Sequence, residues 1–344
     1  MHTTPAVSII VPVHNGGNRF ARCLESLEKT KDHAHEIIVV ADGDTDNSWR
    51  LAETSGCRII RFPEPGGPAR ARNAGAAEAT GEILFFVDAD VTVPPDAVHR
   101  IAGFFNREPE VSAVIGSYDD APAENHFLSQ YRNLLHHFTH QTSNREASTF
   151  WGACGAIKRS VFHKMGGFNE SYSRPCIEDI EFGYRLKKAG FRINLFKEFQ
   201  VKHLKRWDAL SMLKTDLRDR AIPWTLLIHD TKGFINDLNI TRSSRASVIA
   251  AYSLLVSMAG AILFTRLLYV SAFSAILLLV LNRGLYSFFR EKRGLFFAAR
   301  AIPWHWLYYL YSGLGFVIGS LIWKFNRFRR HERGQNGMRF TLDQ

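Results

Sequence analysis

Short apolar runs alternate with amphipathic segments through the first third of the chain. The apolar, β-branched runs that read as strands are residues 7–11, 36–40, 57–60 and 83–87. The intervening segments with helical spacing are residues 20–27, 48–54 and 69–79. This β-α-β-α order predicts an α/β fold with a mostly parallel sheet covered on both faces. A further strand is expected at 111–116 and a helix rich in His and aromatic residues at 125–140, before a second block at 150–203.

The end of the chain has a different pattern, because residues 248–282 carry almost no charge and 304–323 are apolar and aromatic. Segments of about 20 such residues are long enough to span a bilayer. Residues 248–264 and 267–281 read as a hairpin around Arg266, and 304–323 as a third segment. Arg266 either contacts a lipid phosphate or reaches to an interface. Three spans would put the basic tail outside, against the positive-inside rule, so a re-entrant or interfacial third segment and a different hairpin count both stay open.

The chain has 344 residues and a net charge of +10. Much of the excess lies at 283–333, where ten basic residues face two acidic ones. Because this charge lies beside apolar segments, it favours binding to anionic lipid headgroups. No DNA-binding motif accompanies it, so nucleic acid is not expected as a partner. The four cysteines have no paired short spacing, so neither a zinc site nor a disulfide framework is indicated.

The composition predicts four regions. These are a catalytic domain at 1–230, a juxtamembrane linker at 231–247, transmembrane or interfacial helices at 248–326 and a basic cytosolic tail at 327–344. The first residues lack a basic stretch followed by a long apolar one, so no signal peptide is expected. We therefore expect a bacterial-type plasma membrane location with the catalytic domain in the cytosol.

Two carboxylates directly follow the apolar run at 83–87. A strand has a period of two residues, so Asp88 and Asp90 share a face at its carboxyl end, where an open α/β sheet binds ligands. Two such carboxylates repel one another unless a cation lies nearby, and Mg²⁺ or Mn²⁺ is commonly held by carboxylates plus substrate phosphates. The alternative is a solvated pair in a turn.

The other strands end in polar loops at the same edge. Asp42 ends the second strand, where a carboxylate suits a base N–H or a ribose hydroxyl. Arg70 and Arg72 enter the next helix after two glycines, and guanidinium groups beside free N–H donors favour diphosphate. Residues two apart do not share a helical face, so one of these two arginines is expected to be structural.

Together these motifs resemble glycosyltransferase family 2, the inverting enzymes of GT-A fold. The resemblance covers about residues 5–210 and rests on the ordered set Pro12-Val13-His14-Asn15, Asp42, Arg70-Ala71-Arg72-Asn73, Asp88-Ala89-Asp90, Gly166-Gly167-Phe168-Asn169-Glu170 and Glu178-Asp179. It implies donor binding by Pro12, His14, Asn15, Asp42, Arg70, Arg72, Asn73, Asp88 and Asp90, with the divalent metal on Asp90. Ala-Asp-Gly-Asp replaces the family's frequent Asp-Asp-Gly-Ser at residues 41–44, which leaves the base open.

The second block supplies the acceptor side. The family resemblance makes Asp179 the general base that deprotonates the acceptor hydroxyl, supported by Glu178, and brings His203 near the metal. Gly152 permits close approach of a sugar, and Trp151 is either a stacking platform or buried packing. Glu181 and Arg185 have the spacing of a helical ion pair.

Residues 203–207 are similar to the Gln-x-x-Arg-Trp motif of processive polysaccharide synthases, with His203 in place of the Gln. That departure favours single or few transfers. Arg206 and Trp207 are then acceptor-side residues or an interfacial anchor.

The sequence thus predicts a membrane-anchored, metal-dependent transferase that uses a nucleotide-diphosphate sugar and a lipid-linked or saccharide acceptor; it leaves a homo-oligomer open. A polyprenyl-phosphate glycosyltransferase is the nearest alternative, and the Gly-Gly-Phe and Glu-Asp block argues against it. A nucleotidyltransferase would need a basic residue in the loop at 12–17, which has none. The intact carboxylate set disfavours an inactive membrane scaffold.

Overall fold

The computed structural model describes residues 4–231 and 241–332. The chain divides into two compact units, which we call the sheet unit, up to Arg206, and the helical unit, from Trp207. Each is described by itself. The region boundaries expected at residues 230, 247 and 326 remain predictions.

The sheet unit is built on one mixed sheet with the strand order β3-β2-β1-β4-β8-β6-β9-β5, and β7 pairs with β9 beside this path. Its strands are β1 (Val7–Val13), β2 (Glu36–Asp42), β3 (Arg58–Phe62), β4 (Ile83–Val87), β5 (Val91–Thr92), β6 (Ala113–Tyr118), β7 (Glu146–Ala147), β8 (Cys154–Lys158) and β9 (Ile193–His203). The first four strands are parallel, as their apolar runs predicted. β8 is antiparallel to both of its neighbours, β4 and β6.

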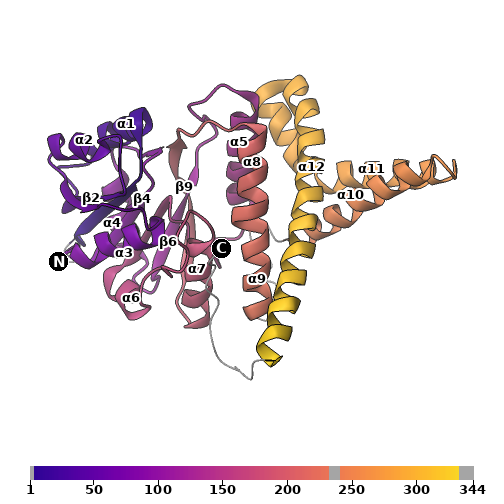
Figure 1. Cartoon of the computed structure of the whole chain (residues 1–344). Coiled ribbons are helices and arrows are strands. Elements are labelled where there is room, and N and C mark those ends of the chain that lie inside the picture. Colours follow the sequence, from indigo (N-terminus) through magenta and orange to yellow (C-terminus); the bar gives the residue numbers. More distant parts are fainter. Residues whose placement is uncertain (1–3, 232–240, 333–344) are drawn as a thin grey trace. The chain divides into compact units, whose positions relative to one another are not determined.

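Helices cover both faces of this sheet (Figure 1). They are α1 (Gly17–Glu28), α2 (Ser48–Thr54), α3 (Pro68–Glu78), α4 (Ala97–Arg107), α5 (Phe127–Thr142), α6 (Arg159–Lys164) and α7 (Glu178–Lys188). In β4 the side chains alternate between two cores: Phe85 packs with residues of α1 and α4, and Phe86 with residues of α3, α6 and α7. The period of two that predicted the strand thus explains why both of its faces are buried.

Strand register brings the polar loops of the sheet unit together. β5 pairs with the end of β9 so that Val91 lies opposite His203. β4 pairs with β8 so that Val87 lies opposite Cys154. The residues that follow Val87 therefore lie between the loop before β8 and the end of β9.

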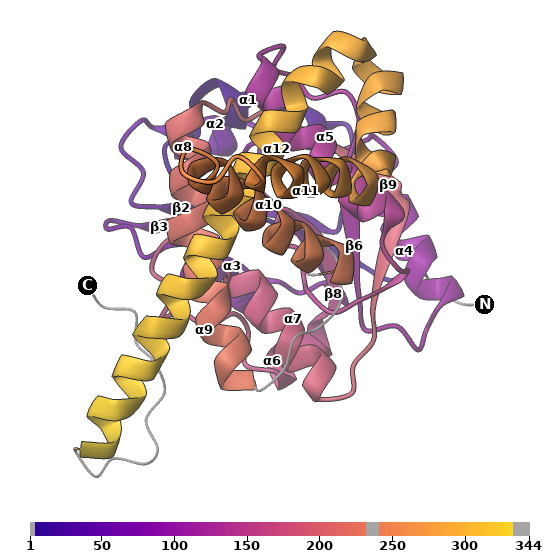
Figure 2. The same cartoon turned by 90° about the vertical axis from the view of Figure 1, so that its right-hand side faces the viewer.

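The helical unit contains α8 (Ala209–Lys214), the π-helical turn η1 (Thr215–Ala221), α9 (Ile222–Thr231), α10 (Arg242–Gly260), α11 (Leu267–Leu281) and α12 (Arg283–Glu332). The hairpin expected around Arg266 is present as α10 and α11, which lie side by side in both views (Figures 1 and 2). α12 is bent at Gly294, whose φ is 84°, and contains the third apolar segment.

One helix of the described residues, Arg283–Arg329, is long and apolar enough to cross a membrane, and Leu267–Leu281 is apolar but shorter. The helix of α12 continues through Glu332, and the rest of the expected basic tail lies outside the described residues.

Candidate active site

The loop after β2 is organised by the Asp42 carboxylate. This buried group accepts the backbone N–H of Gly66 at 2.9 Å and of Gly67 at 2.7 Å. Arg70, in the first turn of α3, donates to the same carboxylate at 2.5 Å. Asp42 therefore holds the glycine turn and the start of α3 against the carboxyl end of β2, at the edge predicted to receive the donor.

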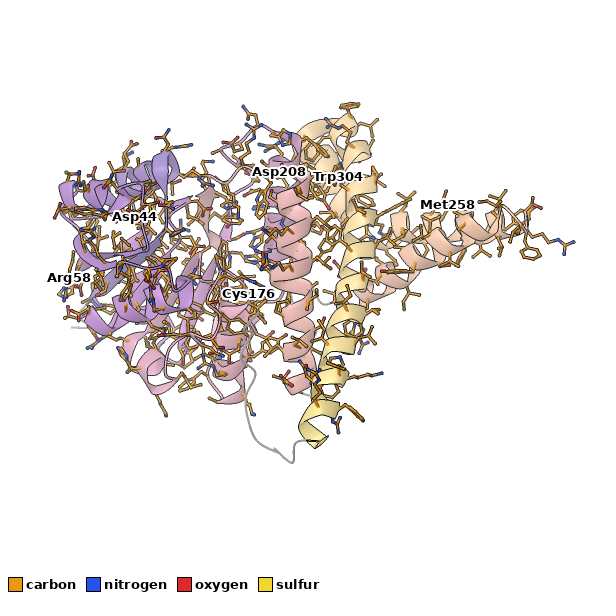
Figure 3. The ribbon with its side chains drawn as sticks, in the orientation of Figure 1. Asp44, Arg58, Cys176, Asp208, Met258 and Trp304 are labelled. Carbon is orange, nitrogen blue, oxygen red and sulfur yellow. The ribbon has the colours of Figure 1, made fainter. Side chains whose placement is uncertain are left out.

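The turn after β1 is tied to the same edge. His14 Nδ1 lies 2.7 Å from the Asp42 carbonyl oxygen. The Asn15 side-chain oxygen accepts the Thr45 N–H at 2.8 Å, and the Asn15 N–H donates to Asp44, which Figure 3 labels. Asn15 has a φ of 51°, a strained conformation that these bonds support. Pro12 lies three residues before Asn15, within β1.

Arg72 lies at the centre of the site and is almost fully buried. One of its terminal nitrogens donates to Asp88 at 2.7 Å and the other to Glu178 at 2.9 Å. Gly152 makes room for it, since a Cβ there would stand 2.7 Å from the guanidinium carbon. Arg72 thus joins the loop after β4 to the start of α7.

Asp88 and Asp90 differ in their surroundings. Partial removal from water raises the pKa of Asp88, against the lowering effect of Arg72. Removal from water also opposes ionisation of Asp90, but the facing His203 ring outweighs it and brings the pKa of Asp90 to about 2. The Asp90 carboxylate lies 3.6 Å from His203 Nε2. Asp90 is therefore the more strongly ionised of the two carboxylates.

Asp90 and His203 together fit a divalent cation that takes its remaining ligands from substrate and water. One or two carboxylates plus substrate phosphates are the usual ligands of Mg²⁺, and a neutral imidazole nitrogen is acceptable to Mn²⁺. Among the described residues there is no group of three His, Cys, Asp or Glu side chains that could hold a metal by itself. A donor diphosphate would have to complete such a site.

Asp179 and Glu178 occupy the first turn of α7 but have different partners. Glu178 is 4% exposed; its two carboxylate oxygens accept from Arg72 and, at 2.9 Å, from the Cys176 N–H. Asp179 is half-buried, and its two carboxylate oxygens accept the Gly152 N–H at 3.1 Å and the Ile180 N–H at 2.8 Å. Of the two residues, Asp179 is the less buried. The predicted pair of Glu181 with Arg185 is confirmed, at 2.8 Å.

Asn73 fixes the loop that precedes α7. Its side-chain oxygen accepts the Phe168 N–H at 2.8 Å, and its side-chain nitrogen donates to the Phe168 carbonyl at 2.9 Å. A Cβ at Gly167 would meet the Asn73 oxygen at 2.5 Å. The structure thus brings Asn73 together with the Gly-Gly-Phe motif, nearly a hundred residues later in the chain.

An aromatic cluster stands beside Asp90. The His203 ring stacks on Tyr118 at 4.3 Å, and Tyr118 meets the edge of Trp151 at 4.7 Å. The His136 ring, from α5, lies 5.0 Å from Trp151. Sequence reasoning did not include Tyr118 or His136. Tyr118 is the last residue of β6, as Asp42 is the last residue of β2. Its place at the end of a strand was the sequence signal that could have identified it.

The last two predicted residues differ in exposure. Arg206 is exposed, whereas Trp207 is 4% exposed. Trp207 thus has a packed side chain, and its acceptor-side role stays a prediction, as does that of Arg206.

Comparison with known proteins agrees with this geometry. Residues 8–166 match the model of glycosyl transferase family 2, and residues 132–208 match that of the N-terminal domain of galactosyltransferase. The family 2 model thus matches most of the sheet unit.

Two bacterial relatives illustrate the similarity. The glycosyltransferase GlyG of Streptococcus pneumoniae is 32% identical over 117 residues, which are 33% of this chain and 38% of the relative. The probable glycosyltransferase YdaM of Bacillus subtilis is 26% identical over 213 residues, 57% of this chain and 50% of the relative. The chain therefore spans half or less of the length of these relatives.

A solved structure extends the likeness in fold. The mannosyltransferase of Pyrobaculum calidifontis, solved in complex with GDP-Man and Mn²⁺, has a TM-score of 0.52 and covers 92% of this chain and 88% of its own. Its identity of 18% shows the fold alone. The GT-A fold expected for the sheet unit is confirmed.

Proposed function

We propose that this protein transfers a sugar from a nucleotide-diphosphate sugar to a hydroxyl of a lipid-linked or envelope saccharide, with inversion at the transferred carbon. The observation that carries the proposal is the bridge through Arg72, which joins Asp88 on the donor side to Glu178 on the acceptor side. Asp90 and Asp179 follow these two residues in the chain. Their carboxylates therefore belong to one site with a donor half and an acceptor half.

On the donor half, the loops after β1, β2 and β4 would hold the nucleotide. Asp42 fixes the glycine turn, so that Arg70 in the first turn of α3 would stand beside the diphosphate. A divalent metal held by Asp90 and His203 would neutralise charge on the departing diphosphate. Mn²⁺ is present with a nucleotide sugar in the related mannosyltransferase.

On the acceptor half, Asp179 would act as the general base. The acceptor oxygen attacks the anomeric carbon, the bond from that carbon to the diphosphate oxygen breaks, and the hydroxyl proton passes to the Asp179 carboxylate. A single displacement of this kind inverts the carbon. Glu178 is unsuited to be the base because it is almost fully buried and one of its oxygens accepts from the Arg72 guanidinium, so we propose that it positions Arg72.

The membrane part of the proposal rests on the helical unit and its basic residues. Apolar helices beside an excess of arginine favour attachment to the cytosolic face of a bacterial-type plasma membrane. Lipid-linked acceptors and cytosolic nucleotide sugars meet at that surface.

Replacing Asp179 with Asn tests the mechanism. We expect donor affinity, measured by calorimetry with Mn²⁺, to stay near the wild-type value while turnover falls by at least about 10²-fold, the scale of a lost general base. Asp96→Asn, an exposed carboxylate at the start of α4, is the matched control. Wild-type turnover in Asp179→Asn would contradict the proposal and favour a polyprenyl phosphate acceptor, which needs no base.

Replacing Asp90 with Ala tests the metal. We expect wild-type protein to bind the donor nucleoside diphosphate more tightly with Mn²⁺ than without it, and the variant to bind equally weakly in both conditions. UDP and GDP, each titrated with and without Mn²⁺, also show which base the site accepts. If Mn²⁺ changes the affinity of the wild-type protein for neither nucleotide, the metal has no place in the proposed site.

A further inference from the structure

The α10–α11 hairpin has its polar side chains inside and its apolar side chains outside. The buried positions include four serines and one asparagine, namely Ser247, Ser257, Ser271, Ser274 and Asn282. The exposed positions include Ile249, Leu255, Val256, Met258, Leu268, Tyr269, Val270, Phe273, Ile276 and Val280. A hairpin surrounded by water would show the opposite distribution.

Hydrogen bonds run along the seam between the two helices. Ser257 and Ser271 are joined at 2.8 Å, and Ser274 donates to Ser253 at 2.9 Å. Asn282 donates to Ser247 at 3.1 Å. Small hydroxyl residues let two helices approach closely and hold them together in lipid, where apolar contact gives no net driving force between helices.

The tip of the hairpin is the most exposed apolar part of the helical unit. Ile262 is 85% exposed, and Leu263 and Phe264 follow it. Met258, which Figure 3 labels on α10, is 59% exposed. A lipid acyl layer can shelter three consecutive large apolar side chains at a tip from water. Unlike a protein partner, it does not need a surface of complementary shape.

The lengths of α10 and α11 limit how deeply the hairpin can enter a bilayer. With 19 and 15 residues, α10 and α11 are about 28 and 22 Å long at 1.5 Å per residue. The shorter helix falls below the thickness of about 30 Å of a hydrocarbon core. At the open end of the hairpin, Arg242, Arg245 and Arg283 match the charge of anionic headgroups.

α12 is held against charged neighbours within the helical unit. Tyr311 donates to the buried Asp216 at 2.7 Å, and a Cβ at Gly315 would meet Ala221 at 2.5 Å. Both partners lie in η1, which also carries Arg218, Asp219 and Arg220. Taking η1 through a bilayer with α12 would cost about 2.5–3.5 kcal/mol for each such charge. α12 therefore suits the interface, although its length and composition fit a span.

We propose that α10–α11 is a re-entrant membrane hairpin, which inserts into the lipid acyl layer with residues 262–264 deepest and returns to the face it entered. Arg266 is the one charged residue between 246 and 282, and its cost of about 2.5–3.5 kcal/mol is offset by the apolar side chains that enter with it. The serine seam holds the helices together there, and the apolar outer face contacts acyl chains. The basic residues on both sides of the apolar segment 304–323 then stay on one side of the membrane, with α12 at its surface. This arrangement removes the conflict between three apolar segments and the positive-inside rule.

The first test measures insertion of the full-length protein into vesicles of phosphatidylethanolamine and phosphatidylglycerol. Leu263→Glu/Phe264→Glu places two carboxylates at exposed positions, where the fold in water does not need the apolar side chains. We expect its flotation with vesicles to fall at least about tenfold, because each charge opposes entry into the acyl layer. Leu51→Glu, at an exposed leucine of α2, should float as the wild type does. Unchanged flotation of the double variant would overturn the proposal.

The second test separates a re-entrant hairpin from a spanning one and from a protein interface. Thr265→Cys at the tip and Ser243→Cys at the base are compared after Cys57 and Cys176 are replaced by serine. In cell-derived vesicles, a membrane-impermeant maleimide should label residue 243 from the cytosolic face and residue 265 from neither face. Labelling of residue 265 from the outer face would show a span. Protection of residue 265 in lipid-free protein would show a protein contact; either result overturns the proposal.

Neither test measures sugar transfer. A failed insertion result is therefore distinguishable from a failure of the proposed reaction.

Discussion

Arg70 and Arg72 show how position on a helix separates two identical residues. They stand two apart at the start of α3, and their guanidinium groups go to different carboxylates, Arg70 to Asp42 and Arg72 to Asp88 and Glu178. A helix turns about 200° over two residues, so they cannot share a face. Their different partners agree with this, whereas a donor-binding role for either arginine stays a prediction. Which of them is buried could not be predicted, because that depends on the glycine at position 152, distant in sequence.

Removing the Arg72 guanidinium leaves two carboxylates close together with no cation between them. We expect Arg72→Met to lower the free energy of unfolding of the sheet unit by about 3–5 kcal/mol, the scale for breaking a buried ion pair on one side. Arg72→Lys should recover only part of this loss, since one ammonium cannot match the two-sided fork. The measurement is urea unfolding followed by tryptophan fluorescence.

Arg58→Met provides the control, because Arg58 pairs with Glu78 at the surface, where such pairs contribute about 0–1 kcal/mol. If Arg72→Met and Arg58→Met unfold at the same urea concentration, the buried bridge does not hold the two halves of the site together.

At the scale of elements, the placement of α7 depends on one glycine. A Cβ at Gly183 would stand 2.3 Å from the Phe150 backbone nitrogen and 2.5 Å from the Thr149 Cα. Gly183 lies four residues after Asp179, so both face the loop that leads to Gly152. This close approach allows the Gly152 N–H to reach the Asp179 carboxylate.

We expect Gly183→Ala to push α7 away from this loop and to lower turnover more than donor affinity, because Asp179 moves while the donor loops do not. The accompanying stability loss should be about 1–3 kcal/mol, as for other overpacked sites. Gly103→Ala in α4 is the control, since its nearest neighbour is the far end of the Arg107 side chain. Equal kcat in Gly183→Ala and the wild type would show that this helix contact does not position the base.

The elements themselves were predictable to different degrees. β1 to β4 and α1 to α3 follow from the local pattern and are found within a few residues of where it indicated them. The short strand β5 and the antiparallel β8 do not, because strands of this kind are defined by their partners rather than by their own residues. His203 meets Asp90 only through that β5–β9 register, so the sequence suggested the contact through family resemblance alone.

On the scale of the whole molecule, the two units differ in the kind of side chain that they bury. The sheet unit buries its apolar side chains, whereas α10 and α11 bury serines and expose leucine, isoleucine and phenylalanine. Hydropathy along the chain reveals the apolar segments, but not that their few polar residues face one another. That information requires the pairing of two helices.

The charge of the whole molecule should make its membrane attachment depend on lipid charge. The net charge is +10, and exposed arginines such as Arg242 and Arg283 flank the hairpin. Each basic residue near an anionic surface contributes about 1 kcal/mol, an attraction that salt screens within a Debye length of about 10 Å at 0.1 M. We expect vesicle affinity to rise with phosphatidylglycerol content and to fall as salt increases.

Arg242→Gln/Arg283→Gln should weaken binding to anionic vesicles by about tenfold or more at low salt and have a much smaller effect at 1 M salt, where the attraction is screened. Arg107→Gln/Lys188→Gln removes the same charge from exposed positions of the sheet unit and serves as the control. Co-sedimentation with vesicles of graded phosphatidylglycerol content measures all three proteins. If both double variants lose affinity equally, only net charge matters; if the loss is confined to Arg242→Gln/Arg283→Gln, those arginines lie at the headgroups, where a hairpin inserted from its tip would place them.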